Sequence, residues 1–470
     1  MTRSRSRAVT LAVVLGLLTV GLAGATAVSA EYAEPAPSSD AGAAPGQESV
    51  TVTVTMDGTP ADAQVVVRSP SGDVETVAYT DPLEPGRADL SLSPGRYTFE
   101  IDAGGGVVSE RVYRNVTVDG YEVVSVDVDR RYEPNDRGYY SADLHAHSIY
   151  SVDTNDSPMD EFVAAQLAAD LDVLFISDHN TVRGHDELKN YAQKRDVPYL
   201  LSDELSTEAD ADRAADPTPA YDGGTYGHFN VYPIEAGQPV DWTGTPDDFF
   251  GAARDAGAEV IQANHPRRDD NYFHHIDSPE YNDSYETVEV YNRGYNGDEA
   301  ETIDRLFGFW NQGYRYTAVG VSDDHESGTL GNEYGSPRTY VYMDQRPSGL
   351  GADFASAVDD QHAFVTYGPL VYLETAGGAI PGENATATNG TVTLTAEIRN
   401  VGELSSATIV RNGEPVRNVT LDGERATVEH EASVDDDSWF VVRVRDEEGA
   451  QGTRAMTNPI WVSADDDDSS

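Results

Sequence analysis

The sequence contains no cysteine. This absence excludes disulfide bonds, zinc sites built on thiolates and cysteine nucleophiles. The chain also lacks a Gly-X-Ser-X-Gly motif, so the serine nucleophile that this turn carries in many hydrolases is not indicated. Any catalysis must therefore come from oxygen and nitrogen groups.

Basic residues are scarce. Lys and Arg total 31 against 82 Asp and Glu, the formal net charge is −51, and only two of the basic residues, Lys189 and Lys194, are lysines. The acids are scattered rather than grouped in blocks, which favours a surface adapted to concentrated salt, where screening weakens self-repulsion. Binding of cations or basic partners is the alternative. The same negative field repels nucleic-acid phosphates, so we expect no nucleic-acid partner.

The first 30 residues predict a secretory signal peptide. A basic start is followed by an apolar run from Ala8 to Val28 and by small residues that end at Ala30. An uncleaved anchor is the alternative, because about 20 apolar residues can also span a bilayer. No twin-arginine pair is present, which favours the Sec route and a secreted or cell-surface protein. Residues 31–48, rich in Pro, Ala and Gly, predict a flexible linker.

Two segments carry the short alternating runs that are typical of β-strands. In residues 49–131, strands are predicted at 50–54, 64–67, 96–101 and 123–128, which indicates an N-terminal β-sandwich. Residues 377–462 predict a C-terminal β domain with a hairpin at Arg411-Asn412-Gly413-Glu414. Residues 463–470 form an acidic tail that we expect to be disordered. These β domains are candidates for contact with a polymer or the cell surface.

The region between them, residues 132–376, alternates short apolar runs with helical patterns. Ser157-Pro158 and Thr245 each predict the start of a helix, and 172–176 predicts a buried strand. Such alternation over about 240 residues indicates a parallel α/β architecture, with a barrel as the favoured closed form.

Histidines and carboxylates punctuate this region where predicted strands end. That edge is where α/β barrels gather their site residues. The two imidazoles of a His-X-His segment point to one side of a strand, so one ion can take both. Imidazole and carboxylate ligands suit zinc, manganese or iron. The segments are 143–147, 177–181, 203–204, 228–230, 264–266 and 322–325.

Five motifs in this order resemble the PHP (polymerase and histidinol phosphatase) superfamily, and most closely its carbaryl-hydrolase branch (CehA/McbA). They read Asp-Leu-His-Ala-His-Ser, Ile-Ser-Asp-His-Asn-Thr, Gly-His-Phe-Asn, Asn-His-Pro and Val-Ser-Asp-Asp-His. The resemblance covers about Tyr140 to Pro369, and Thr457-Asn458-Pro459 is similar to the same branch. It implies a distorted (β/α)7 barrel, here flanked by the two all-β sandwich-like domains.

The resemblance also implies a ligand set for two or three divalent ions. One ion is expected on four side chains, among which Glu204 bridges to a second ion. A third ion is expected beside them, with Asp153 one place later than the usual acid. The implied ligands are His145, His147, Glu204 and Asp323 for the first ion, Glu204, His228 and His265 for the second, and His179, His325 and Asp153 for the third.

Three further acids belong to this pattern. Asp143 and Asp178 are expected either to accept hydrogen bonds from ligating imidazoles or to cap the loop backbone. Glu289, at the end of another predicted strand, is expected to support the site rather than to ligate.

These expectations predict a metal-dependent hydrolase in which a metal-bridging hydroxide is the nucleophile. A small-molecule phosphoester is the favoured substrate by resemblance, with Glu204 and Asp323 at the reacting centre. Arg267 and Arg293 are the predicted phosphate clamps, with Arg268 beside them. The alternatives are a carbamate, ester or amide hydrolase and a cell-surface binding protein with an inactive barrel.

The charge balance predicts a salt dependence of stability. The melting temperature should be higher in molar KCl than in dilute buffer, because salt screens the repulsion among −51 net charges. Thermal melts over a KCl series check this. Equal or greater stability at low salt would contradict adaptation to salt.

Overall fold

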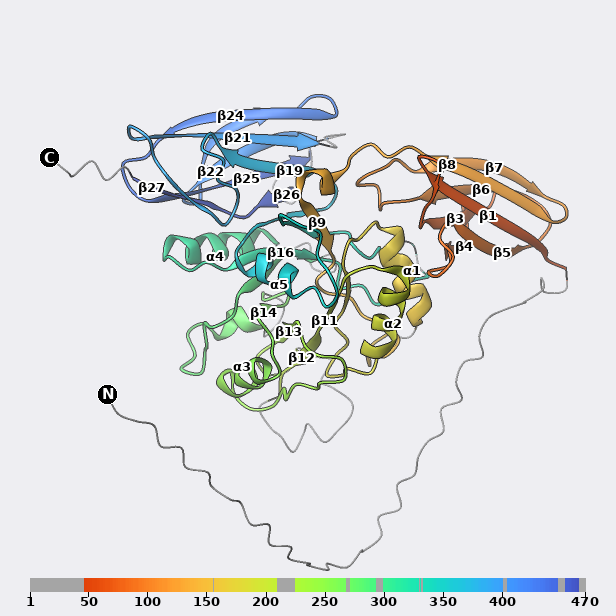
Figure 1. Ribbon diagram of the computed structural model, residues 1–470, viewed down its shortest axis with the longest axis horizontal. Helices are drawn as coiled ribbons and strands as arrows, with labels where there is room; N and C mark the ends of the chain where they lie inside the picture. The colour runs from red at the N-terminus through yellow and green to blue at the C-terminus, as the bar shows by residue number, and fades with distance from the viewer. Residues whose placement is uncertain are drawn as a thin grey trace, which may run out of the picture. The chain divides into compact units, whose positions relative to one another are not determined.

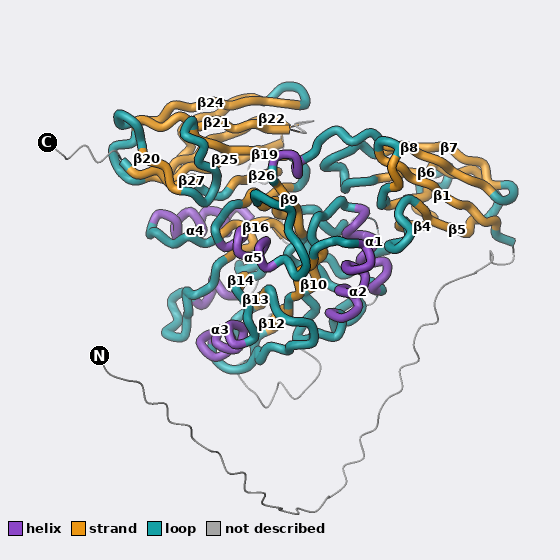
Figure 2. Tube along the Cα trace, in the orientation of Figure 1, coloured by secondary structure: helices purple, strands orange, loops and turns teal. Residues whose placement is uncertain are grey.

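A computed structural model describes residues 46–154, 156–208, 225–267, 271–292, 299–328, 330, 333–399, 404–446 and 453–464. It is shown as a ribbon in Figure 1 and by secondary structure in Figure 2. Within these ranges, no helix is both long and apolar enough to cross a membrane. The predicted signal peptide, residues 465–470 of the acidic tail and nearly all of the predicted linker lie outside them, whereas Ser463, predicted to begin the disordered tail, ends a strand.

The N-terminal part is built from two sheets over one apolar core. One sheet has the order β2-β1-β5, with β8 parallel to β1, and the other has the order β4-β3-β6-β7. Alternate valines of β1 point inward to meet Phe99 and Ile101 of β6. The four predicted strands are confirmed as β1, β3, β6 and β8. The strands are β1 Glu48–Met56, β2 Thr59–Pro60, β3 Gln64–Arg68, β4 Val74–Tyr79, β5 Arg87–Leu92, β6 Gly95–Asp102, β7 Val112–Val118 and β8 Glu122–Val128.

The described residues of the middle part combine strands with five α-helices. Helices α1 and α2 lie side by side in Figures 1 and 2 and share one apolar core with β10 and β11. The elements are η1 Pro134–Arg137, β9 Tyr139–Ala142, α1 Met159–Ala168, β10 Leu174–Ile176, α2 His185–Arg195, β11 Tyr199–Leu201, β12 Asp203–Ser206, β13 His228–Tyr232, α3 Pro246–Asp255, β14 Val260–Ala263, η2 Tyr272–His275, β15 Thr287–Asn292, α4 Glu299–Asn311, β16 Thr317–Val321, β17 Arg338–Tyr342, α5 Ala352–Asp359 and β18 Ala363–Thr366.

Two helix starts were predicted, and they differ in outcome. Thr245 begins α3 with a capping box, in which its backbone N–H donates to the carboxylate of Asp248 at 2.9 Å. Ser157, in contrast, does not cap α1, which starts at Met159 directly after Pro158. The hydroxyl of Ser157 instead lies 2.8 Å from that of Tyr334.

Strand directions in the middle part are mixed. The pairs β10–β11, β14–β15 and β15–β16 are parallel, but β13 is antiparallel to both of its neighbours, β12 and β14. Antiparallel neighbours need no crossover helix. In addition, no helix lies between β11 and β12, which belong to different sheets and are separated by a single residue, Ser202. The pairings therefore depart from a fully parallel strand–helix alternation, and a closed (β/α)7 barrel stays a prediction.

The C-terminal strands are continuous with the middle part. Strand β26 pairs with β18, so the sheet β20-β27-β25-β26 runs on into β18-β17-β9. Strand β19 pairs with β21 although it precedes the predicted limit at residue 377. Asn412 and Gly413 both have positive φ in the predicted hairpin between β22 and β23. The strands are β19 Leu370–Thr375, β20 Asn384–Thr386, β21 Thr391–Arg399, β22 Leu404–Arg411, β23 Glu414–Thr420, β24 Arg425–Ser433, β25 Ser438–Asp446, β26 Thr453–Thr457 and β27 Ile460–Ser463.

Asn458, in the turn between β26 and β27, links this sheet to β16. Its side chain is fully buried, accepts from Ala318 N at 2.7 Å and donates to Ala318 O at 3.0 Å and Ala363 O at 3.1 Å. Ala318 belongs to the strand that leads to Asp323. One amide side chain thus hydrogen-bonds backbone groups of β16, the strand at the end of the order β12-β13-β14-β15-β16.

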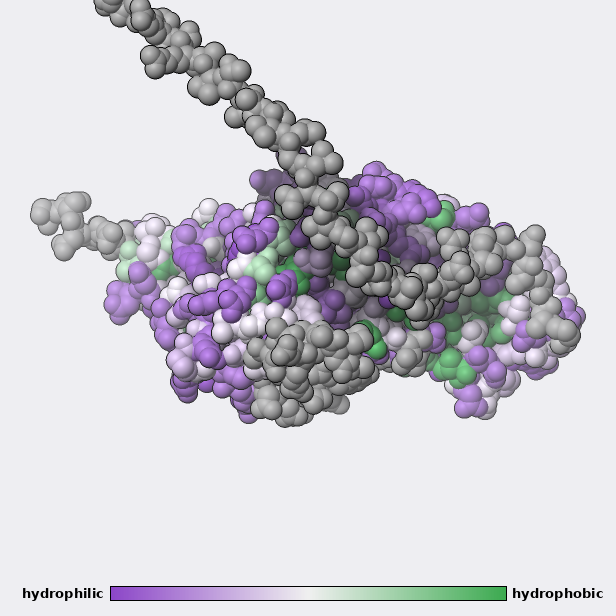
Figure 3. Space-filling model, turned by 90° about the horizontal axis from the view of Figure 1, so that it is seen from below, coloured by the Kyte–Doolittle hydropathy of each residue, from purple (hydrophilic) through white to green (hydrophobic). Residues whose placement is uncertain are grey.

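The surface agrees with the sequence in being polar. The face seen in Figure 3 is largely hydrophilic, with small hydrophobic areas between charged and polar residues. Large exposed apolar side chains among the described residues include Tyr113 and Tyr121.

Replacing Asn458 by Ala should lower the free energy of unfolding by about 2–3 kcal/mol, because buried backbone groups of Ala318 lose their partners. Urea unfolding followed by tryptophan fluorescence measures the change. The exposed Asn418 on β23 offers a control, and Asn418→Ala should change stability by less than about 0.5 kcal/mol. Equal losses in the two variants would contradict the role of Asn458.

Candidate metal centre

The structure brings all nine predicted ligands together, eight of them in strands or within five residues of a strand's end. His145 and His147 follow β9, His179 follows β10, and Glu204 lies in β12. His228 is the first residue of β13, and His265 follows β14. Asp323 and His325 follow β16, and Asp153 lies in the loop before α1.

Four ligand atoms form an inner group. The Nε2 atom of His145 lies 3.0 Å from Glu204 Oε2 and 3.1 Å from Asp323 Oδ1. The Nε2 atom of His147 lies 3.2 Å from each of the same two oxygens and 3.0 Å from His145 Nε2. Atoms that share a tetrahedral ion at about 2.0–2.1 Å are about 3.3 Å apart, so this group has the spacing of one metal site.

The second carboxylate oxygen of Glu204 faces another pair of imidazoles. Glu204 Oε1 lies 3.0 Å from His228 Nδ1 and 3.7 Å from His265 Nε2. The two oxygens of one fully buried carboxylate thus meet two different histidine pairs. This is the geometry expected of a carboxylate that bridges two ions.

A third group lies nearer to solvent. Asp153 Oδ2 is 3.1 Å from His179 Nε2 and 2.9 Å from His325 Nε2. The side chain of His325 is 29% exposed and that of Asp153 17%, whereas that of Glu204 is 0% exposed. Asp153 therefore occupies the expected ligand position although it stands one place late in the motif.

Unpaired polar atoms support metal binding. Among the described residues, the buried His228 Nε2 has no hydrogen-bond partner, and the buried His228 Nδ1 and Glu204 Oε2 have charged neighbours at 3.0 Å but no well-directed hydrogen bond. Leaving such groups unpaired is costly, and metal coordination would satisfy them. Four overlapping sets of these side chains place one ligand atom each close enough to share an ion: His147/Asp153/His179/His325, His145/His147/Asp323, His145/Glu204/His265 and His179/Glu204/His228.

The electrostatics of the site favour cations. Burial opposes charge on His145, yet the carboxylates of Asp323 and Glu204 raise its pKa well above the usual value. Burial likewise opposes a raised pKa at His147, but the same acids raise it to about 10. At His228 the effect of burial exceeds that of the Glu204 carboxylate, so the pKa of its imidazole is lowered to about 4. Protons thus balance the buried carboxylates without metal, and divalent ions would displace those protons on binding.

Glu289 supports the site, as predicted, rather than joining the ligand atoms. Its Oε1 lies 2.7 Å from His145 Nδ1, and its Oε2 accepts from the backbone N–H of His265 at 2.7 Å. Glu289 therefore fixes ligands of two groups. An acid that receives the far nitrogen of a ligating imidazole sets its ring orientation and raises its basicity.

Asp143 and Asp178 take the other of their two predicted roles. Asp143 accepts from Ser322 N at 2.9 Å and from Gly335 N at 2.7 Å. Asp178 accepts from Ser148 N at 2.7 Å and from the Ser148 hydroxyl at 2.8 Å. In the described part of the chain, their hydrogen bonds go to loop groups and not to imidazoles.

Several neutral side chains at the site escaped sequence analysis. Asn264 donates to Glu204 Oε1 at 2.9 Å, and Asn292 donates to Asp323 Oδ2 at 3.2 Å. Ser206 Oγ lies 2.7 Å from His179 Nδ1. Asn264 stands within the quoted motif Asn-His-Pro, so its place beside His265 was the available signal. Ser206 follows Glu204 by two residues and thus faces the same side of β12.

Two ligands sit on unusual backbone. His265 has φ 26° and Asp323 has φ 55°, both in the left-handed region that non-glycine residues seldom adopt. Such conformations cost about 1–3 kcal/mol each and persist where the surroundings fix them, often at functional sites. Here the turn after each strand directs the side chain toward the cluster.

Of the two predicted arginine clamps, the described one, Arg267, does not join the cluster. Arg267 forms an ion pair with the exposed Glu301 of α4. Among the described residues, no ion pair or hydrogen bond links the Arg267 side chain to any of the nine ligands. Arg268 and Arg293 lie outside the described residues. A role for Arg267 in holding phosphate therefore stays a prediction.

Comparison with known proteins adds little. No protein-family model and no curated protein matches the sequence. Among solved structures, a candidate metal-dependent phosphoesterase from Bifidobacterium adolescentis is 18% identical, with 41% of this chain and 91% of that chain covered and a TM-score of 0.29. The Bacillus anthracis TIE protein is 18% identical, with 23% and 20% covered and a TM-score of 0.16. The fibronectin(III)-like modules of Clostridium thermocellum CbhA are also 18% identical, with 20% and 92% covered and a TM-score of 0.14. At these TM-scores the similarities carry no argument about fold or function.

Replacing Glu289 by Gln should weaken metal binding by about 10–100-fold, because the ligating imidazole of His145 loses its anionic partner. Competition with a chromophoric chelator measures the affinity. Glu286→Gln is a matched control, since Glu286 binds Ile261 N and Arg254 instead of a ligand. Equal affinities for E289Q and the wild type would contradict the supporting role.

Proposed function

We propose that the chain is a multinuclear metal-dependent hydrolase. The observation that carries the proposal is the fully buried carboxylate of Glu204, whose two oxygens face two separate groups of imidazoles. A structural histidine cluster has no need of a buried acid that is shared in this way. Zn, Mn or Fe ions suit the imidazole and carboxylate donors.

The positions of the residues indicate which ion each would hold. His145, His147 and Asp323 would hold one ion, His228 and His265 a second, and Glu204 would join them. Divalent ions held this close together lower the pKa of water toward 7 and stabilise developing negative charge. Glu289 keeps the imidazole of His145 oriented, and the outer group with Asp153 would hold a third ion near solvent.

A small-molecule phosphoester is the substrate class that we propose. Its non-bridging oxygens can be shared among two or three ions, so each ion contributes to the transition state. The resemblance of the five motifs to the carbaryl-hydrolase branch of the PHP superfamily supports a hydrolase and keeps carbamates, esters and amides as the alternative. The apolar start of the chain supports a secreted or surface-attached enzyme.

A binding protein with an inactive barrel is the candidate from a different class. Lost ligands would be expected in such a protein. All nine predicted ligand positions carry a histidine or carboxylate, and they lie together in the structure. We therefore favour the enzyme.

The test compares turnover of aryl phosphate monoesters and diesters with aryl carboxylic esters and carbamates, before and after removal of metal with a chelator. Phosphoester cleavage should dominate and should return when Mn²⁺ or Zn²⁺ is added. Arg267→Ala should lower phosphoester turnover by about 10–100-fold, which corresponds to about 1.4–2.7 kcal/mol, and should leave metal content intact.

Glu301→Ala is the matched control, because it removes the ion-pair partner and keeps the arginine. Carboxylic-ester or carbamate turnover far above phosphoester turnover, with no effect of Arg267→Ala, would favour the alternative enzyme. Absence of any turnover in protein that binds metal would favour the binding protein.

A further inference from the structure

The outer ligands Asp153 and His325 lie on loops, whereas Glu204 and His228 of the inner groups lie in strands β12 and β13. Both outer side chains are partly exposed, so burial fixes them less than it fixes Glu204. Ser151 Oγ donates to Asp153 Oδ1 at 2.7 Å, and His325 Nδ1 lies 2.9 Å from Asp323 O. Contacts further along the two loops add to these in setting where the loops lie.

Ser327 joins the two loops. It lies two residues after His325 and is fully buried. Its backbone N–H donates to Asp156 O at 3.3 Å, three residues after Asp153, and its hydroxyl donates to Glu161 Oε2 of α1 at 3.1 Å. A displacement of Ser327 would thus move both outer ligands.

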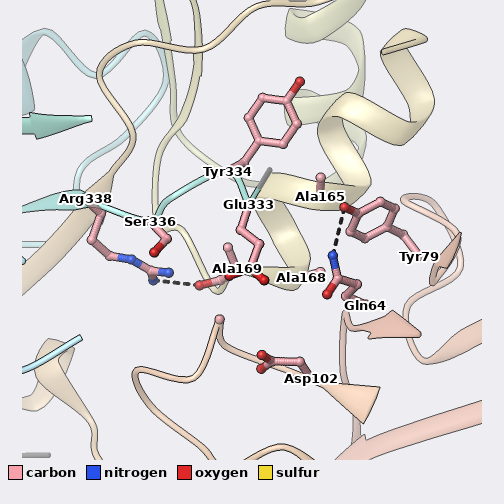
Figure 4. A pocket seen from close by; sticks show the side chains of 11 residues that line it. Gln64, Tyr79, Asp102, Ala165, Ala168, Ala169, Glu333, Tyr334, Ser336 and Arg338 are labelled. Atoms are coloured by element: carbon pink, nitrogen blue, oxygen red, sulfur yellow. Dashed lines mark hydrogen bonds between the residues drawn. The ribbon is translucent and has the colours of Figure 1, made fainter. Parts of the chain in front are cut away.

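The carbonyl of Ser327 is held by a residue of the N-terminal sheets. Tyr79, the last residue of β4, donates from its hydroxyl to Ser327 O at 2.7 Å across 248 positions of sequence. Gln64 of β3 donates to the same hydroxyl at 3.1 Å (Figure 4). Burial raises the pKa of Tyr79 above its usual value, so the phenol stays protonated and remains a donor.

Arg111, the residue before β7, makes a second contact between the N-terminal β domain and the part of the chain that follows Ser327. Arg111 pairs with Glu333 at 3.2 Å. The next residue, Tyr334, donates to His147 O at 3.0 Å. Glu333, Tyr334, Tyr79 and Gln64 line one small cavity of about 30 Å³ (Figure 4). The N-terminal β domain therefore contacts Ser327 and Glu333, which stand two residues from His325 and one residue from the partner of His147 O.

We infer that Tyr79 is a positioning residue of the metal centre, through which the N-terminal β domain fixes the outer ligands Asp153 and His325. The inference rests on the proposed function, since it presupposes a metal at the outer group. It gives the N-terminal domain a role in the chemistry of the site. Without the hydrogen bond from Tyr79, the two loops lose their shared anchor and the outer ion binds more weakly.

The test titrates metal-free full chain with Mn²⁺ and follows free Mn²⁺ by electron paramagnetic resonance. Tyr79→Phe keeps the ring and removes the donor. It should weaken the most weakly bound ion by about five- to tenfold, as expected for one hydrogen bond, and leave the tighter ions unchanged. The spectrum of the bound ions should change only in the part that comes from the outer site.

Asp62→Asn is the matched control. It breaks the ion pair between Asp62 and Arg195 at 2.7 Å, which ties the same N-terminal domain to α2, away from both loops. This variant should bind all ions as the wild type does.

Equal Mn²⁺ affinities for Tyr79→Phe and the wild type would overturn the inference and leave the proposed function standing. Equal weakening by Asp62→Asn would also overturn it, because the effect would then come from domain packing in general. A wild-type chain that binds two ions would overturn the outer site alone. A wild-type chain that binds none would overturn the proposed function as well.

Discussion

The structure depends on one buried negative charge. Glu204 lies with no exposed surface among imidazoles, and an isolated carboxylate in such a place would be prohibitively unstable. Cations on both sides of the carboxylate remove that cost, whether they are protons on histidines or metal ions. His145 and His147 on one side and His228 on the other must therefore stay close together. The strands β9, β12 and β13 that carry them are constrained accordingly.

The support around this charge explains the other polar groups at the site. Glu289 and Asn264 reach the ligand atoms directly, whereas Asp143 and Asp178 hold the loops that carry them. Both kinds of support are buried, so each hydrogen bond also satisfies a group that would otherwise be unpaired. The positive φ of His265 and Asp323 is maintained within this network.

Sequence reasoning located the segments that carry the candidate ligands because polar residues that interrupt buried strands form a local pattern, whereas the choice of individual ligands came from the resemblance to the PHP superfamily. It located the helix start at Thr245 and the hairpin at Asn412-Gly413 because each signal lies within a few residues. It did not give the antiparallel direction of β13, which depends on how distant segments meet. It did not predict the hydrogen bond from Tyr79 to Ser327 either, because the sequence around a tyrosine at a strand end does not indicate a partner 248 residues away.

The bond between Asn458 and Ala318 has a consequence for the order in which the molecule forms. The two residues are 140 positions apart. Ala318 therefore emerges from the ribosome long before its partner exists, and β16 stays incompletely bonded during that interval. Asp323 follows β16, so the hydrogen bonds that hold this strand beside a candidate ligand can form only after Asn458 has been synthesised.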